Sequence, residues 1–198
     1  MPTNPAVAIA DPRTARLLAR FLHARAGGVP AAASYLNEDE SASVVIATFK
    51  ESPVPGRAVF STAGLSSVPN VLDGDDIRVE LMACAAVDDE AIENVLAMCA
   101  FAVASSGWLA APGVVFPDVV AEYVRDTTVP HLMWTEPFSV AGLSSAEVAD
   151  VGVVHWLQGL PLTDREVEYL QRNGFDALED RLAGARVEYD DLRRASVC

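Results

Sequence analysis

Two short segments place a serine in a setting that a nucleophile could use. Both read Gly-Leu-Ser, at Gly64–Ser66 and at Gly142–Ser144. A nucleophile elbow requires G-x-S-x-G, because only small residues permit the strained turn that exposes the serine. Val68 and Ala146 stand where the closing glycine belongs. The pattern therefore favours ordinary turn serines, and a hydrolase that uses Ser66 is kept as an alternative.

Residues that could hold a metal ion or a nucleotide do not occur in the required spacing. His23, His131 and His155 are far apart, and no H-x-x-x-H or C-x-x-C pair exists. The acidic run Asp73–Asp76 begins like a calcium loop, but Cys84 takes the twelfth position, which needs a bidentate acid. G-x-x-x-x-G-K-[ST] and G-x-G-x-x-G are absent. We expect no metal and no cofactor.

Arg78 and Glu80 put two charges into the apolar segment 77–84. Alternate residues of a strand share a face, so both side chains should point one way while Val79 and Leu81 point the other. Such a pair fits a surface ladder, a contact with a partner, or a partly buried pair that needs further hydrogen bonds. We favour a structural use.

The pattern of apolar residues predicts both helices and strands around these residues, and therefore an α+β fold. Short links between the first three apolar runs favour an antiparallel meander. The stretch from Val95 to Ala104 is apolar nearly all round, so we expect a central buried helix, begun by an Asp88 cap. The runs that read as strands are 43–49, 57–62, 77–84, 131–138 and 151–160.

Helix start signals occur near both ends of the chain. Asp11 and Pro12 supply an N-cap and a first-turn proline for a helix that ends at Gly27. Thr163 and Glu166 form a capping box that begins a C-terminal helix, and a second short helix follows. These signals complete the predicted set of elements.

We predict one domain over residues 11–184. It has a mixed, mostly antiparallel sheet, a buried central helix and C-terminal helices. Residues 1–10 are expected to be a flexible N-terminus, and 185–198 a polar C-terminal tail that frays.

Composition limits the partners. A chain of 198 residues that is 51% hydrophobic is not a disordered protein. Lys and Arg total 14 against 28 Asp and Glu, a net charge of −14. Phosphate backbones and anionic membranes repel such a chain, so we expect neither nucleic-acid nor membrane binding. Three cysteines and no secretory signal fit a cytoplasmic protein.

Two motifs occur in an order that is typical of one known family. The first is T-x-G-L-S at 62–66, followed after a loop with Pro69 by R-x-E-L at 78–81. The second is an apolar strand followed by P-L-T-x-x-E at 161–166. Together they resemble the suppressor of fused (SUFU) domain family over residues 35–184. The matching residues, which we expect to be structural, are Thr62, Gly64, Ser66, Arg78, Glu80, Leu81, Pro161, Thr163 and Glu166.

The resemblance implies a mixed α+β domain that binds proteins and has no catalytic activity. Animal members bind a transcription factor of the hedgehog pathway, and related bacterial domains are proposed as immunity proteins that neutralise polymorphic toxins. The small acidic chain is similar to the bacterial group, because acidity speeds encounter with a basic toxin domain. We therefore predict such an immunity protein. The alternatives are a hydrolase using Ser66, with His131 or His155, and an intracellular regulatory scaffold.

Two acidic turns are the predicted partner-binding residues. Their like charges would steer a basic partner, although acidic turns also serve solubility alone. They are Glu38, Asp39, Glu40, Asp73, Asp75 and Asp76.

Overall fold

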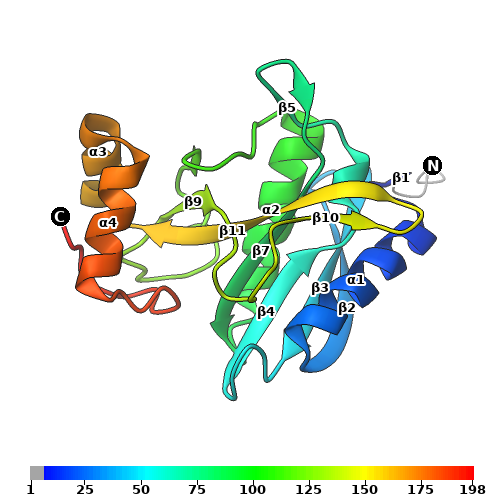
Figure 1. Ribbon diagram of the computed structural model, residues 1–198, viewed down its shortest axis with the longest axis horizontal. Coiled ribbons are helices and arrows are strands. Elements are labelled where there is room, and N and C mark those ends of the chain that lie inside the picture. The colour runs from blue at the N-terminus through cyan, green and yellow to red at the C-terminus, as the bar shows by residue number, and fades with distance from the viewer. Residues whose placement is uncertain (1–6) are drawn as a thin grey trace.

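Alternating apolar side chains along the strands fill a separate core on each face of one curled sheet. The computed structural model describes residues 7–198 (Figure 1). Ala58 and Phe60 join the core on one face, and Val59 between them joins the core on the other. The elements in chain order are β1 (Val7–Ala8), α1 (Pro12–Ala26), β2 (Val29–Leu36), β3 (Ala42–Lys50), β4 (Arg57–Thr62), the 3₁₀ turn η1 (Leu65–Ser67), β5 (Val71–Leu72), β6 (Asp75–Asp76), β7 (Val79–Ala86), α2 (Ala91–Ser106), β8 (Val115–Phe116), β9 (His131–Thr135), β10 (Ser145–Val148), β11 (Gly152–Leu162), α3 (Asp164–Asn173) and α4 (Phe175–Ala185).

The main sheet runs β1-β3-β4-β7-β11-β9-β8, with β2 paired to β3 and β10 paired to β11. Strands β3, β4 and β7 form the predicted antiparallel meander. Two pairs are parallel, β1 with β3 and β7 with β11. β5 and β6 form a small separate hairpin. The predicted α+β fold with a mostly antiparallel sheet is confirmed.

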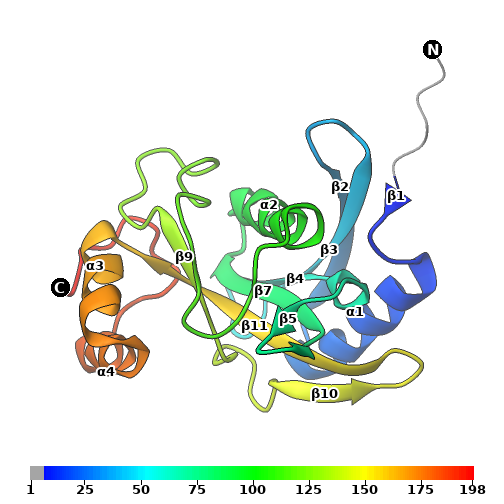
Figure 2. The same cartoon turned by 90° about the horizontal axis from the view of Figure 1, so that it is seen from above.

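Helices cover both faces and one end of this sheet. α2 lies over one face and α1 under the other (Figure 2). α1 buries Leu18 and Leu22, and α2 buries Leu96. Leu178 and Leu182 of α4 pack with β9 and β11 at the far end of the sheet. The helix predicted to be central therefore packs on the sheet, as expected.

The helix starts and the N-terminal segment differ in part from the expectations. Asp11 caps α1 as predicted, accepting from the backbone N–H groups of Arg13 and Thr14. The Asp88 cap is wrong, because α2 begins at Ala91 behind Glu90, whose side chain makes no cap hydrogen bond. Residues 1–6 of the predicted flexible N-terminus lie outside the described residues, whereas β1 pairs with β3.

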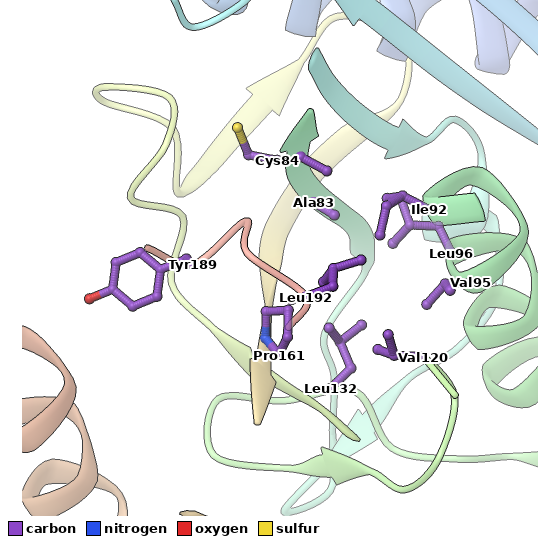
Figure 3. A pocket seen from close by; sticks show the side chains of 12 residues that line it. Ala83, Cys84, Ile92, Val95, Leu96, Val120, Leu132, Pro161, Tyr189 and Leu192 are labelled. Atoms are coloured by element: carbon purple, nitrogen blue, oxygen red, sulfur yellow. The ribbon is translucent and has the colours of Figure 1, made fainter. Parts of the chain in front are cut away.

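The polar C-terminal tail is packed against the domain, contrary to the expected fraying. Leu192 is 4% exposed and joins the core beneath α2, and its carbonyl accepts a hydrogen bond from the Thr128 N–H at 3.1 Å. Leu192 and Tyr189 are among the residues that line a small apolar cavity of about 10 Å³, whose lining side chains are drawn in Figure 3. A cavity of that size is too small for a ligand. The tail thus completes the core.

Two glycines offer a matched test of packing inside and outside that core. A Cβ at Gly159 of β11 would lie 2.7 Å from the Leu132 side chain, whereas a Cβ at Gly184 of α4 meets nothing within 4 Å. We expect Gly159→Ala to lower the free energy of unfolding by about 1–3 kcal/mol through overpacking. Gly184→Ala should raise it by about 0.5–1 kcal/mol, because alanine favours the helix. Urea denaturation of both variants measures these changes. Equal changes in the free energy of unfolding would contradict the close packing of Gly159 against Leu132.

Across residues 7–198, the helices are all too short or too polar to cross a membrane.

Candidate functional site

The two parts of the first motif, T-x-G-L-S and R-x-E-L, meet at one buried carboxylate, Glu80 of β7. Its Oε1 accepts hydrogen bonds from the backbone N–H of Gly64 at 3.0 Å, and from the N–H and hydroxyl of Ser66 at 2.9 and 2.7 Å. Its Oε2 accepts from the Thr62 hydroxyl at 2.5 Å and the Leu65 N–H at 3.2 Å. T-x-G-L-S therefore forms a cradle of five donors around the glutamate of R-x-E-L.

Backbone geometry explains the glycine of this cradle. Gly64 has φ +123°, and a Cβ there would collide with Ala10. Burial raises the pKa of Glu80, while the hydrogen bonds from Thr62, Ser66 and Gly64 act in the opposite direction. The carboxylate has no exposed surface and is in contact with the turn that it holds by these five hydrogen bonds.

Arg78 does not pair with Glu80; such a pair was one of the possibilities that the sequence left open for the two charges. Its guanidinium lies 2.6 Å from Asp76 Oδ2 and donates to the Ser66 carbonyl at 3.3 Å. Leu81 is fully buried in the core beneath α2. The first motif therefore acts inside the molecule, with Arg78 tying its turn to the β5–β6 hairpin.

The second motif surrounds another buried carboxylate, Glu166, with groups from the C-terminal tail. Thr163 and Glu166 form the predicted capping box. Arg194 donates to both Glu166 oxygens, at 2.6 and 2.8 Å, and to the Pro161 carbonyl at 2.7 Å. Burial raises the pKa of Glu166, but the hydrogen bonds from Arg194, Thr163 and Val197 outweigh it and hold that pKa below its ordinary value.

Ser66 and His131, two residues of the hydrolase alternative, have other partners, and His155 is half-buried in β11. Ser66 is buried and its hydroxyl donates to Glu80. His131 lies between two acidic residues of other segments, with Nε2 2.9 Å from Asp164 and Nδ1 accepting from the Asp118 N–H at 3.0 Å. Within residues 7–198 no group of three or more His, Cys, Asp or Glu side chains is placed to hold a metal ion. The Ser66 hydroxyl is thus buried and held against a carboxylate that accepts from four further donors.

The two predicted acidic turns lie on different hairpins. Glu38, Asp39 and Glu40 form the exposed turn between β2 and β3, where the hydroxyl and N–H of Ser41 lower the pKa of Asp39. The other turn belongs to the β5–β6 hairpin, at residues 73–76. Only the first turn reaches a large open hollow beside α2.

This hollow, which we call the α2 groove, has a volume of about 670 Å³. Its lining residues come from the β2–β3 hairpin on one wall, from α2 on the floor and from the segment after α2 on the other wall, and Figure 2 shows α2 between that hairpin and that segment. The apolar pattern of α2 predicted burial on all sides, so the sequence did not reveal its open face. The lining residues are Tyr35, Leu36, Asn37, Glu38, Asp39, Asn94, Ala97, Met98, Phe101, Ala102, Ser105, Ser106, Trp108, Val119, Glu122 and Tyr123.

Known proteins are similar to this chain in sequence and in fold. The sequence profile "Suppressor of fused protein (SUFU)" matches residues 40–195. The Immunity protein YqcF of Bacillus subtilis (strain 168) is 30% identical over 185 residues, covering 92% of this chain and 96% of YqcF.

Two solved structures have the same fold. The putative SUFU homologue of Neisseria gonorrhoeae FA 1090 has a TM-score of 0.72 at 17% identity, covering 94% of this chain and 97% of that one. A chain of the Sufu–Fu complex has a TM-score of 0.67 at 14% identity, covering 93% and 92%. Because the profile spans most of the chain and the YqcF match nearly all of it, the chain belongs to the suppressor of fused (SUFU) family.

Proposed function

We propose that this chain is an immunity protein, which neutralises a toxin domain in the cytoplasm by binding it directly and without catalysis. The observation that carries this proposal is the 30% identity to an immunity protein across almost the whole of both chains. A shared function is favoured when similarity extends over the entire fold instead of one segment.

Charge and motif chemistry support the proposal. A net charge of −14 accelerates encounter with a basic partner, such as a nuclease domain. The Ser66 hydroxyl, which a hydrolase would use, donates a hydrogen bond to Glu80. Direct binding therefore requires fewer additional assumptions than catalysis.

A regulatory scaffold is the second candidate, because one chain of the same fold was solved in the Sufu–Fu complex. The two candidates differ in the partner: a toxin stops growth when it is expressed alone, whereas a regulatory protein does not.

The test begins with capture. The tagged full-length chain is expressed in its source organism, and the bound proteins are identified by mass. Each bound protein is then expressed in a neutral host alone and together with this chain. We expect one bound protein to arrest growth and this chain to restore it. Bound proteins that are all harmless alone would overturn the immunity function and favour the scaffold.

Ser66→Ala separates binding from catalysis in the same assay. The variant removes one of five donors to Glu80, so circular dichroism first establishes that it is folded. Direct binding predicts that the variant restores growth as well as the unaltered chain does. Loss of rescue by a folded Ser66→Ala chain would favour the hydrolase.

A further inference from the structure

One face of α2 is left partly exposed although the helix is apolar nearly all round. Met98, Phe101 and Ala102 are half-buried, while Leu96 and Cys99 are fully buried. A helix with apolar residues on all sides is expected to be covered on all sides. Within the described chain these three side chains, which we call the Met98–Ala102 stripe, stay partly exposed and form the floor of the α2 groove.

The rims add exposed side chains of the kinds that dominate protein interfaces. Leu36 is 54% exposed, Trp108 39% and Tyr123 45%, and all three line the groove. Trp108 packs edge-on against Phe116, with ring centroids 4.9 Å apart, so its position is fixed before a partner arrives. Aromatic residues and Met are enriched at interface centres, and fixed anchors reduce the entropy lost on binding.

The charges of the groove have one sign. Glu38 and Asp39 stand on one wall and Glu122 on the other, and no lysine or arginine is among its lining residues within 7–198. Burial, Glu122 and Glu38 raise the pKa of Tyr123, which places both walls' carboxylates in its field. A second copy of this chain would bring carboxylates against carboxylates, so charge complementarity favours a basic occupant.

We propose that the α2 groove binds a basic amphipathic helix of the partner protein, with apolar side chains on the Met98–Ala102 stripe and Lys or Arg against Glu38, Asp39 and Glu122. The proposal rests on the immunity function, in which that partner is the toxin domain. A helix fits because its apolar residues, three and four apart, match a groove whose floor is itself a helix face.

The test uses two defined peptides and the emission of tryptophan. Trp134 and Trp156 are at most 2% exposed, so changes on binding report Trp108. The first peptide is an amphipathic helix of leucine and lysine, and the second has glutamate in place of lysine. We expect the lysine peptide to shift Trp108 emission saturably at low salt, and the glutamate peptide to leave it unchanged. Equal responses to both peptides would overturn the proposal.

Two charge-reversal variants locate the binding surface. Glu38→Lys/Glu122→Lys alters the groove, and Asp73→Lys/Asp75→Lys makes the same charge change on the β5–β6 hairpin. The groove variant should bind the lysine peptide at least about tenfold more weakly, as loss of electrostatic steering predicts, and the hairpin variant within about threefold of the unaltered chain. Equal weakening by both would mean that net charge alone attracts the peptide, and would overturn the groove.

The peptide titration contains no toxin, so its outcome is independent of the growth assay. A failed titration overturns the groove and leaves the immunity function standing. Captured proteins that are all harmless alone overturn the immunity function, whatever the peptide does.

Discussion

Replacing Glu80 with alanine is expected to lower the free energy of unfolding by about 3–5 kcal/mol. The change leaves three backbone N–H groups and two hydroxyls of the 62–66 turn without their acceptor, in a site that water does not reach. Each unsatisfied buried donor costs about 1–3 kcal/mol unless the turn rearranges. Urea denaturation followed by circular dichroism measures the loss.

Two further glutamate variants separate the cradle from a general effect of charge. Glu80→Gln keeps the shape of the side chain but offers a single carbonyl to the five donors. Its free energy of unfolding should therefore lie between that of the unaltered chain and that of Glu80→Ala. Glu136 is exposed, and Glu136→Ala should change stability by no more than about 0.5 kcal/mol. If Glu80→Ala lowered the free energy of unfolding by less than Glu136→Ala does, the cradle would not hold the turn.

Replacing Arg194 with alanine should also destabilise the chain by about 3–5 kcal/mol. The guanidinium that binds both oxygens of Glu166 disappears, and a carboxylate with no exposed surface is left without its countercharge. Because Arg194 also binds the Pro161 carbonyl, we expect the tail to release as well. Arg194→Lys keeps the charge without the two-pronged geometry, and should lose less stability than alanine.

The pH dependence of that variant follows from the lowered pKa of Glu166. A carboxyl with a folded-state pKa below its ordinary value of 4.5 stabilises the fold above that pH, and the stabilisation is lost as pH falls through the folded-state pKa. The stability gap between the unaltered chain and Arg194→Ala should therefore narrow as pH falls below 4.5. Unfolding free energies from neutral to acidic pH test this. A constant gap would show that the ion pair contributes nothing.

Much of the fold was predictable because local pattern and tertiary packing agree. The meander of β3, β4 and β7 comes from strands with continuous apolar runs, and the caps at Asp11 and Thr163 depend on neighbours within three residues. β2 was missed, because Val29–Leu36 is an exposed strand containing proline and three alanines, without the usual strand pattern.

Long-range contacts account for the other differences. The tail looks like a polar end, yet Arg194 is the countercharge of Glu166 and Leu192 fills a gap under α2. Sequence spacing gave no reason to join residues that lie 28 positions apart.

The candidate site shows the same limit. The sequence was enough to single out T-x-G-L-S and R-x-E-L. It did not show that one carboxylate accepts from five donors, because that arrangement depends on the pairing of β4 with β7. Of the two acidic turns, only Glu38 and Asp39 line the α2 groove. The groove itself could not be foreseen, because the sequence of α2 does not say which of its apolar faces the sheet will cover.

The most direct test of the proposed function is a titration of the captured toxin with this chain, measuring residual toxin activity against the molar ratio. Neutralisation by direct binding predicts a linear decline that ends at a fixed stoichiometric ratio and does not progress with time. Time-dependent loss of toxin activity at a small fraction of that ratio would show turnover, and would contradict the account.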